Sequence, residues 1–370
     1  MKHKRVLMIG NYPPDRQFSM QGYRQSLMNG LNNRGWNVEV AKAQVRFNRW
    51  PHSKVSKWLG YMDKMVLFPK DLARRAPEYD LIHLIDQGNG FLGGIISQHN
   101  HIATIHDLLA IRASLGEMEG WTVGPSGMRF QQMILSGLRQ MKHFISISDQ
   151  TGRDLVRLVP GIQTHRKILN GLLTPQVRLP RDEADAILAT KGIKPGTKFV
   201  VHLGTGRYKN HVGVVKLYDA LRQTDGLQDL HLVMVTKELL PDTAEIIGTR
   251  SLEQTVHVLA NISDDEVSAL YSAAEMLLFP SLIEGFGLPI IEAQANGCPV
   301  VTSDREPMSE VALDSAVLVD PTNIESGVPR VLERMAHRQQ WIDAGTENIK
   351  RFTFDRWVSD YEEAYTSMLS

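Results

Sequence analysis

The stretch Met276-Leu-Leu-Phe-Pro-Ser-Leu-Ile-Glu-Gly-Phe-Gly-Leu-Pro-Ile-Ile-Glu-Ala293 carries the strongest fold signal in the chain. Its first four residues are apolar and predict a buried strand, and Gly285 and Gly287 mark a turn. Pro289 suits the first turn of a helix, because the N–H that proline lacks would have no partner there. The stretch therefore predicts a strand, a glycine turn and a helix whose N-terminus lies at the carboxyl end of the strand.

The same alternation extends outward in both directions. Apolar runs predict further buried strands at residues 5–9, 37–41, 81–85, 101–105 and 143–147, and at 198–203, 230–235, 256–259, 299–302 and 316–319. Helical stretches lie between some of them, at residues 23–34 and 212–222. Strands separated by helices are typical of parallel sheets, so the predicted class is α/β with doubly wound, Rossmann-like domains.

The length and a central break predict two domains. The chain has 370 residues, and a domain usually takes roughly 100–200. Asn170-Gly171 and the proline-bearing residues 175–180 form a plausible hinge. We expect domains at residues 1–174 and 175–351. Residues 352–370 carry aromatic side chains at three-to-four-residue spacing and predict an amphipathic helix that packs back onto the body.

The net charge of zero is a cancellation between unlike halves. Residues 1–174 carry 23 basic and 12 acidic side chains, whereas residues 175–370 carry 18 and 29. The single cysteine, Cys298, excludes an intramolecular disulfide and a cysteine-cluster metal site. The apolar run at residues 6–9 is too short for a signal peptide, and no window approaches the roughly 18 apolar residues of a membrane span. We therefore expect a cytoplasmic protein.

The carboxylates Glu284 and Glu292 are the first candidate site residues. The N-terminus of the helix that follows Gly287 favours a phosphate group. Carboxylates beside a phosphate site suit hydroxyl groups better than phosphate oxygens, so sugar or ribose hydroxyls are the expected partners. A plain strand–turn–helix connection with solvated glutamates is the alternative interpretation.

A second candidate is the loop Gly204-Thr-Gly-Arg-Tyr-Lys-Asn210, directly after the strand at 198–203. The loop fits neither a P-loop nor the dinucleotide fingerprint, because Asn210 stands where the last glycine would be. Arg207 and Lys209 are complementary tools for neutralising a diphosphate. A pair of ordinary surface cations is the alternative.

These residues resemble a known family. The Glu284–Glu292 pair forms an E-x7-E motif within EGFGLPIIEA, followed by Gly297-Cys-Pro-Val-Val301 and by Glu310-Val311. This block is similar to the donor-binding signature of retaining glycosyltransferases of family 4, also called glycosyl transferases group 1, which have the GT-B fold. Thr104-Ile-His-Asp-Leu-Leu109 resembles the His-Asp segment of that family, and the likeness spans most of residues 100–325.

The resemblance implies transfer of a hexose-type sugar from a nucleotide-sugar co-substrate, with retention, without a required metal and without another cofactor. It places Glu284 on the donor sugar's hydroxyls and Glu292 on the ribose. Arg207, Lys209 and the helix N-terminus would stabilise the leaving diphosphate, and His106 would border the sugar and the acceptor. Further donor-binding residues implied by it are Gly285, Phe286, Gly287, Leu288, Gly204, Asn210 and, from a loop at residues 13–22, Gly22.

Residues 46–75 concentrate the basic excess of the first half. They hold eight basic and two acidic side chains interleaved with aromatic ones, among them the acceptor- or membrane-facing candidates Lys54, Lys57, Trp58 and Lys64. A basic amphipathic helix can lie on an anionic membrane surface, and a core-facing helix with solvated lysines is the alternative. Nucleic acid is not expected, because no recognised binding motif accompanies the charge. We expect a glycan or lipid-linked acceptor, a role in cell-envelope glycan biosynthesis, and peripheral attachment to the inner face of the membrane as a hypothesis.

Other classes remain as alternatives. A two-domain dehydrogenase needs a Gly-x-Gly-x-x-Gly turn, which neither Gly10-Asn-Tyr nor Gly204-Thr-Gly206 supplies. An epimerase shares the fold but lacks the E-x7-E context. A sugar-binding protein with two α/β domains usually carries a secretion signal.

Overall fold

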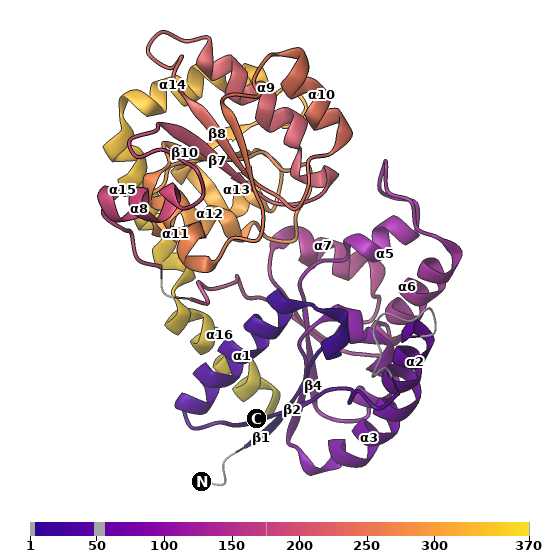
Figure 1. The fold of residues 1–370 in the computed structure, drawn as a ribbon. Helices are drawn as coiled ribbons and strands as arrows, with labels where there is room; N and C mark the ends of the chain where they lie inside the picture. The colour runs from indigo at the N-terminus through magenta and orange to yellow at the C-terminus, as the bar shows by residue number, and fades with distance from the viewer. Residues whose placement is uncertain (1–3, 48–55, 175, 370) are drawn as a thin grey trace. The chain divides into compact units, whose positions relative to one another are not determined.

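The computed structural model describes residues 4–47, 56–174 and 176–369. The chain divides into two units, residues 1–173 with 354–370 and residues 174–353 (Figure 1). Each unit has a six-stranded sheet whose paired strands are all parallel. The doubly wound α/β class predicted from the sequence is therefore confirmed in both halves.

The sheet of the first unit has the strand order β2-β1-β3-β4-β5-β6. Its strands are β1 (Arg5–Ile9), β2 (Asn37–Ala41), β3 (Leu81–Leu84), β4 (His101–Ile105), β5 (His143–Ser146) and β6 (Thr164–Lys167). Its helices are α1 (Phe18–Asn33), α2 (Ser56–Met62), α3 (Phe68–Arg75), α4 (Gly93–Ile96), α5 (Leu109–Ser114), α6 (Pro125–Leu138), α7 (Asp149–Leu158) and α16 (Phe354–Leu369), with a π-helical turn at Asp63–Leu67.

The central strands of this sheet are apolar because helices cover both of its faces. All five residues of β4 are buried, and so are the last four of β1. The edge strand β6 differs, since its four residues are all exposed. It was not predicted, because Thr-His-Arg-Lys carries no apolar signal.

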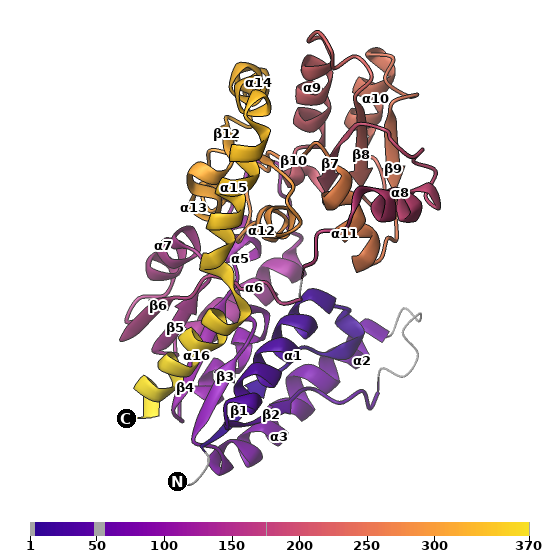
Figure 2. The ribbon, with the colours of Figure 1, turned by 90° about the vertical axis from the view of Figure 1, so that its left-hand side faces the viewer.

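Helix α16 lies against α1 within the first unit (Figures 1 and 2). A methyl group on Gly30 of α1 would come within 2.5 Å of Val358, so this glycine permits the close approach. The Tyr361 hydroxyl meets the Tyr23 hydroxyl at 2.6 Å and the Thr104 hydroxyl at 2.9 Å. Buried aromatic packing and a buried hydroxyl network therefore hold the last helix on this unit.

The sheet of the second unit has the order β12-β11-β10-β7-β8-β9. Its strands are β7 (Phe199–Leu203), β8 (His231–Val235), β9 (Val256–Leu259), β10 (Met276–Phe279), β11 (Val300–Ser303) and β12 (Val317–Val319). Its helices are α8 (Arg181–Ala189), α9 (His211–Arg222), α10 (Pro241–Thr249), α11 (Asp264–Ala273), α12 (Leu288–Ala295), α13 (Met308–Ala312), α14 (Val328–Ala336) and α15 (Arg338–Ile349).

The strand orders locate the crevice of each sheet. The order reverses between β1 and β3 in the first unit, and between β7 and β10 in the second. In open parallel sheets, ligands bind outside the carboxyl ends of the strands at this switch point. A ligand is therefore expected at the loops that follow β1, β3, β7 and β10.

Candidate functional site

Two loops meet at the switch point of the second unit. One follows β7 and includes Gly204 and Asn210, and the other follows β10 and leads into α12. The backbone N–H of Leu282 donates to the carbonyl of Tyr208 at 2.8 Å. The two motifs singled out in the sequence, although about 75 residues apart, therefore lie against each other.

The glycines of the first loop make room for side chains of the loop itself. Gly204 has φ +144°, and a methyl group on it would lie 2.7 Å from the Lys209 side chain. Gly206 has φ +106°, and a methyl group there would lie 3.0 Å from the Tyr208 ring. Glycine at 204 thus allows the Lys209 side chain to fold back across the loop.

Lys209 forms an ion pair with Glu284 across the two loops. The Lys209 Nζ lies 2.6 Å from Glu284 Oε1, and the two side chains are only 12% and 11% exposed. The ammonium also lies over the Phe279 ring, 4.7 Å from its centroid. A lysine and a glutamate that were predicted to contact the same substrate are thus adjacent.

Arg207 has a different environment. Its side chain is 70% exposed and pairs with Asp242 at 2.9 Å. An exposed pair of this kind contributes little to stability. The Arg207 guanidinium can therefore turn from Asp242 toward a ligand at little cost in free energy, whereas the Lys209 ammonium is shielded from solvent.

Asn210 holds the loops in place. It has a left-handed backbone with φ 58° and caps α9, accepting from the Gly213 N–H at 3.2 Å. Its amide nitrogen donates to the carbonyls of Pro280 and Pro321, at 3.0 and 2.9 Å. Its side-chain amide is thus engaged by the protein, which gives Asn210 a positioning role.

The N-terminus of α12 opens onto the same place. Gly287, at φ +106°, precedes the helix, and no side chain caps its first turn. Pro289 lies in the first turn as predicted. Phe286 is buried and packs edge-to-face on Phe352, with the ring centroids 6.0 Å apart. This packing fixes the turn, while the helix dipole favours an anion beyond Leu288.

Glu292 lies one turn into α12 in a shielded position. Burial raises the pKa of its carboxyl to about 7, and the Asp264 carboxylate adds to the rise. The Lys209 ammonium and the Tyr271 hydroxyl oppose it. That hydroxyl is buried and has no hydrogen-bond partner of normal geometry. The Glu292 carboxylate, partly exposed beside this hydroxyl, is therefore suited to accept from a ligand's hydroxyls.

His106 follows β4 in the first unit, at the carboxyl edge of that sheet. Its Nε2 lies 2.9 Å from the Ile85 carbonyl, which can only accept, so Nε2 carries the proton. Burial lowers the pKa of His106, whereas the nearby Asp86 carboxylate raises it. The ring edge also packs on Tyr23, at a centroid distance of 4.6 Å. These contacts fix the orientation of the ring and leave Nδ1 as an acceptor.

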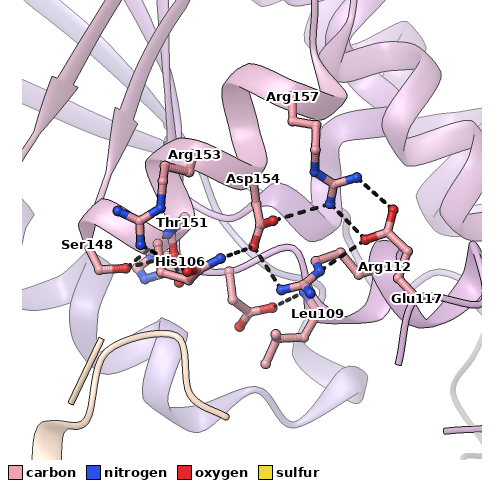
Figure 3. Close-up of polar contacts among 11 residues, drawn as sticks. His106, Leu109, Arg112, Glu117, Ser148, Thr151, Arg153, Asp154 and Arg157 are labelled. Atoms are coloured by element: carbon pink, nitrogen blue, oxygen red, sulfur yellow. Dashed lines mark hydrogen bonds and ion pairs between the residues drawn. The ribbon is translucent and has the colours of Figure 1, made fainter. Parts of the chain in front are cut away.

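An ion-pair network holds the His106 loop against α7 (Figure 3). The Thr151 hydroxyl donates to the His106 carbonyl at 3.3 Å. Asp154, farther along α7, contacts Arg112 at 3.0 Å and Arg157 at 3.2 Å. Glu117 joins the same two arginines. These contacts hold both the loop at His106 and helix α5, which follows it, against α7.

One comparison with known proteins concerns the second unit. Residues 184–348 match the sequence model of the family described as glycosyl transferases group 1. This segment, 165 of the 370 residues, is similar to that family. The resemblance drawn from the E-x7-E block is thereby confirmed.

Similar sequences include two that are mannosyltransferases by name. The chain is 22% identical to O-antigen chain mannosyltransferase B of Escherichia coli over 64% of its own length and 63% of that protein. It is 32% identical to MMP alpha-(1->4)-mannosyltransferase of Mycolicibacterium hassiacum over 38% of its length and 40% of that protein. The chain thus spans less than two thirds of each of these relatives.

Solved structures establish the fold. The Anabaena protein HepE, crystallised with UDP and glucose, superposes with a TM-score of 0.71 at 16% identity, covering 99% of this chain and 100% of that one. At this identity the likeness concerns the fold alone. The chain has the GT-B fold that the sequence predicted.

One predicted site residue, Gly22, is placed differently from expectation. The loop after β1 ends at Gln17, and Gly22 lies in the first turns of α1, exposed, rather than in a loop. The apolar and polar spacing of residues 18–33 continues the helix to an earlier start than residue 23. Lys64 turns inward, pairing with Asp15 at 2.6 Å, and is only 14% exposed. The prediction that Lys64 faces an acceptor or a membrane stays a prediction.

The remaining predictions in residues 46–75 are not tested. Lys54 lies outside the described residues, and the side chains of Lys57 and Trp58 are not described.

Among the described residues, no cluster of three or more histidine, cysteine or acidic side chains could hold a metal. None of the described helices combines the length and the apolar character that crossing a membrane requires. Burial raises the pKa of Cys298 to about 12, so this thiol is inert.

Proposed function

We propose that the protein is a retaining glycosyltransferase that moves a hexose-type sugar from a nucleotide-sugar donor to a glycan, lipid-linked or small-molecule acceptor without a metal. The observation that carries the proposal is the Lys209–Glu284 pair at the switch point, next to the open N-terminus of α12. A cation, a carboxylate and a helix N-terminus in one place match a sugar linked to a diphosphate. The naming of the two relatives as mannosyltransferases and the UDP and glucose bound by HepE support the choice.

The chemistry follows from where charge develops. When the bond between the anomeric carbon and the diphosphate oxygen breaks, the electron pair goes to that oxygen. Lys209, Arg207 and the first N–H groups of α12 stabilise the new charge, which is electrostatic catalysis. Glu284 accepts hydrogen bonds from the donor sugar and keeps Lys209 in position, and Glu292 accepts from the ribose diol. The acceptor hydroxyl attacks from the face that the diphosphate leaves and passes its proton to the departing diphosphate oxygen, which balances the step and gives retention.

A donor panel with a mass-spectrometric readout tests the proposal. The chain is mixed with UDP-, GDP- and ADP-sugars, with and without EDTA, and both transfer and slow donor hydrolysis are measured. Glu284→Gln should reduce kcat on the order of 100-fold, because it removes the charge while leaving an acceptor for Lys209. Exposed Glu253→Gln is the matched control. Unchanged turnover in Glu284→Gln would refute the assigned role, and inactivity in EDTA would refute metal independence.

A dehydrogenase or an epimerase is the alternative activity. The loop after β7 argues against it, since Asn210 adopts a left-handed capping conformation in place of the third glycine of the dinucleotide fingerprint. Thermal stabilisation by NAD, with none from any nucleotide sugar, would favour the alternative.

Peripheral membrane contact is a second proposal, supported by the described part of residues 46–75. Phe47, Met62 and Val66 are exposed apolar side chains, 49%, 44% and 38% exposed, and the basic Lys70 and Arg74 are exposed nearby in the sequence. Such a mixture is typical of surfaces that bind anionic lipid. Sedimentation with phosphatidylglycerol vesicles at low salt should capture the protein. Charge reversal at Lys54 and Lys57 should release it and reversal at Lys194 should not. No sedimentation at low salt would end the proposal.

A further inference from the structure

The switch point of the first unit also holds cavities. One of about 220 Å³ lies between the loops that follow β1, β3 and β4 and helix α6. A wider one of about 470 Å³ adjoins it, and the two share the lining residues Gln17, Asp86, Gln87 and Asp107. The wider cavity is in the range of small-molecule sites, roughly 300–1,000 Å³, and the smaller one is an extension below that range. The cavities occupy the place where the fold is expected to bind a ligand.

The smaller cavity has an excess of carboxylates. Asp15, Asp86 and Asp107 line it, against the single ammonium of Lys64. That ammonium is already paired with Asp15 at 2.6 Å. The wider cavity adds Arg16, which is exposed. A phosphate group in the smaller cavity would therefore meet carboxylates without a free cation to balance them.

Two buried amide atoms in the lining have no partner. Asn11 is 5% exposed and its Oδ1 is unpaired, and Asn89 is 7% exposed and its Nδ2 is unpaired. The orientation of Asn11 is fixed, because its Nδ2 donates to the Asp86 carboxylate, which can only accept. Buried polar atoms are rarely left unpaired in a folded protein. One spare acceptor and one spare donor, on two residues that line the same cavity, together match a hydroxyl group, which both donates and accepts.

Part of the lining is apolar. Phe130, Ile111 and Ile134 line the cavity together with the polar groups. The Asp86 carboxylate is held by the Gly88 N–H at 2.7 Å. Polar groups and apolar side chains in one cavity match a sugar ring, which has hydroxyls around its edge and C–H groups on its faces.

We propose that this cavity binds the acceptor and that the acceptor's binding end is an uncharged polyhydroxylated group, not a phosphorylated one. This inference rests on the proposed function and deepens it by naming the acceptor class. Asn11 and Asn89 bind one hydroxyl, the Asp86 and Asp107 side accepts from others, and Phe130 covers a C–H face of the ring.

Acceptor binding can be measured without the reaction. Ligand-observed saturation-transfer NMR compares neutral methyl glycosides and disaccharides with their 6-phosphates at matched concentration. Neutral sugars should bind, and transfer to them should exceed transfer to the phosphorylated partners on the order of 100-fold in kcat/KM. Equal or stronger use of the phosphorylated sugars overturns the proposal, and so does the absence of binding by any neutral sugar. Failure of the proposed function would show itself differently, as the absence of nucleotide-sugar binding and hydrolysis.

Asn89→Leu gives a test that separates binding from folding. It replaces an unpaired buried amide by an apolar group of similar shape, so the melting temperature should stay equal or rise. Binding of the neutral sugars should fall at least tenfold, whereas exposed Asn33→Leu should leave it unchanged. Unaltered sugar binding in a folded Asn89→Leu protein would overturn the assignment of this cavity.

Asp15→Asn tests the charge argument in the opposite direction. The variant frees the Lys64 ammonium from its partner and should raise the affinity for the phosphorylated sugars at least tenfold. Asp71→Asn, which removes a surface partner of Arg74, is the matched control and should change neither class of ligand. If Asp15→Asn leaves the preference intact, the carboxylate excess does not set the selectivity and the proposal fails.

Discussion

Glu292→Gln should change how the stability of the second unit depends on pH. Burial raises the pKa of this carboxyl from 4.5 to about 7, a shift of about 2.5 units. At about 1.4 kcal/mol per unit, the buried charge costs about 3 kcal/mol of unfolding free energy above pH 7. Between pH 4.5 and 7 the folded protein binds more protons here than the unfolded chain, so stability falls as pH rises through that window. Glutamine cannot ionise and removes this fall.

Two measurements check the reasoning. A ¹³C NMR titration of side-chain carboxyl carbons, with the Glu292 signal identified by its loss in the variant, should give a midpoint near 7. Urea unfolding can be followed by pulsed hydrogen exchange on peptides from residues 174–353. The unfolding free energy of the variant relative to that of the wild type should rise by about 3 kcal/mol between pH 4.5 and pH 8. Glu253→Gln corrects for the change in net charge. A midpoint near 4.5, or a gain that is equal at both pH values, would refute the burial argument.

The same pKa bears on donor binding. If the ionised Glu292 accepts from the ribose diol, only about one tenth of the protein is competent at pH 6, so nucleotide-sugar affinity should fall about tenfold from pH 8 to pH 6. A 2′,3′-dideoxy analogue lacks the diol and should bind without this dependence. Parallel pH profiles for the two ligands would contradict the ribose assignment.

Three further predictions concern the structure that supports the sites. Asn210→Gly keeps the left-handed backbone but removes two hydrogen bonds to Pro280 and Pro321, and should destabilise the second unit by about 2 kcal/mol in denaturant unfolding; an unchanged midpoint would contradict it. Asp154→Asn removes the charge shared by two arginines and should cost about 1 kcal/mol, whereas Asp71→Asn, which removes a single pair with the exposed Arg74, should cost under about 0.5 kcal/mol by the same assay; equal costs would show the network to be unimportant. Removal of residues 354–370 uncovers the buried aromatic side chains of α16 and should cost the first unit about 10 kcal/mol, seen as lost solubility and lost helical circular dichroism; a soluble, cooperatively folding truncation would refute the estimate.

The fold could be predicted from the sequence because most of its strands are visible as apolar runs. Each of the eleven predicted strands is present, with ends shifted by at most one residue, since central parallel strands are buried on both faces and read as apolar runs. Strand β6 was not predicted, because its four residues are exposed at the edge of the sheet and form no apolar run. The Gly22 position was wrong for a similar reason, because the first turns of α1 are mostly polar and resemble a loop.

The candidate site was only partly predictable. Glu284, Glu292 and Lys209 stood out because glycine turns and strand ends mark them in the sequence. Their contacts could not be predicted, because the Lys209–Glu284 pair joins residues that only the strand order brings together. The positioning role of Asn210 and the unpaired amides of Asn11 and Asn89 depend on burial and hydrogen-bond geometry, which a residue's identity does not reveal.

The place of α16 has a consequence for synthesis of the chain. The first unit is completed by residues 354–370, but the ribosome makes all 180 residues of the second unit before them. At about 5–20 residues per second, the surface that Trp357, Tyr361 and Tyr365 will cover stays open for about 10–40 s. The second unit has its whole sequence first and can fold in that interval. The first unit, although its sequence begins the chain, therefore has its packed surface completed only after the whole second unit has been synthesised.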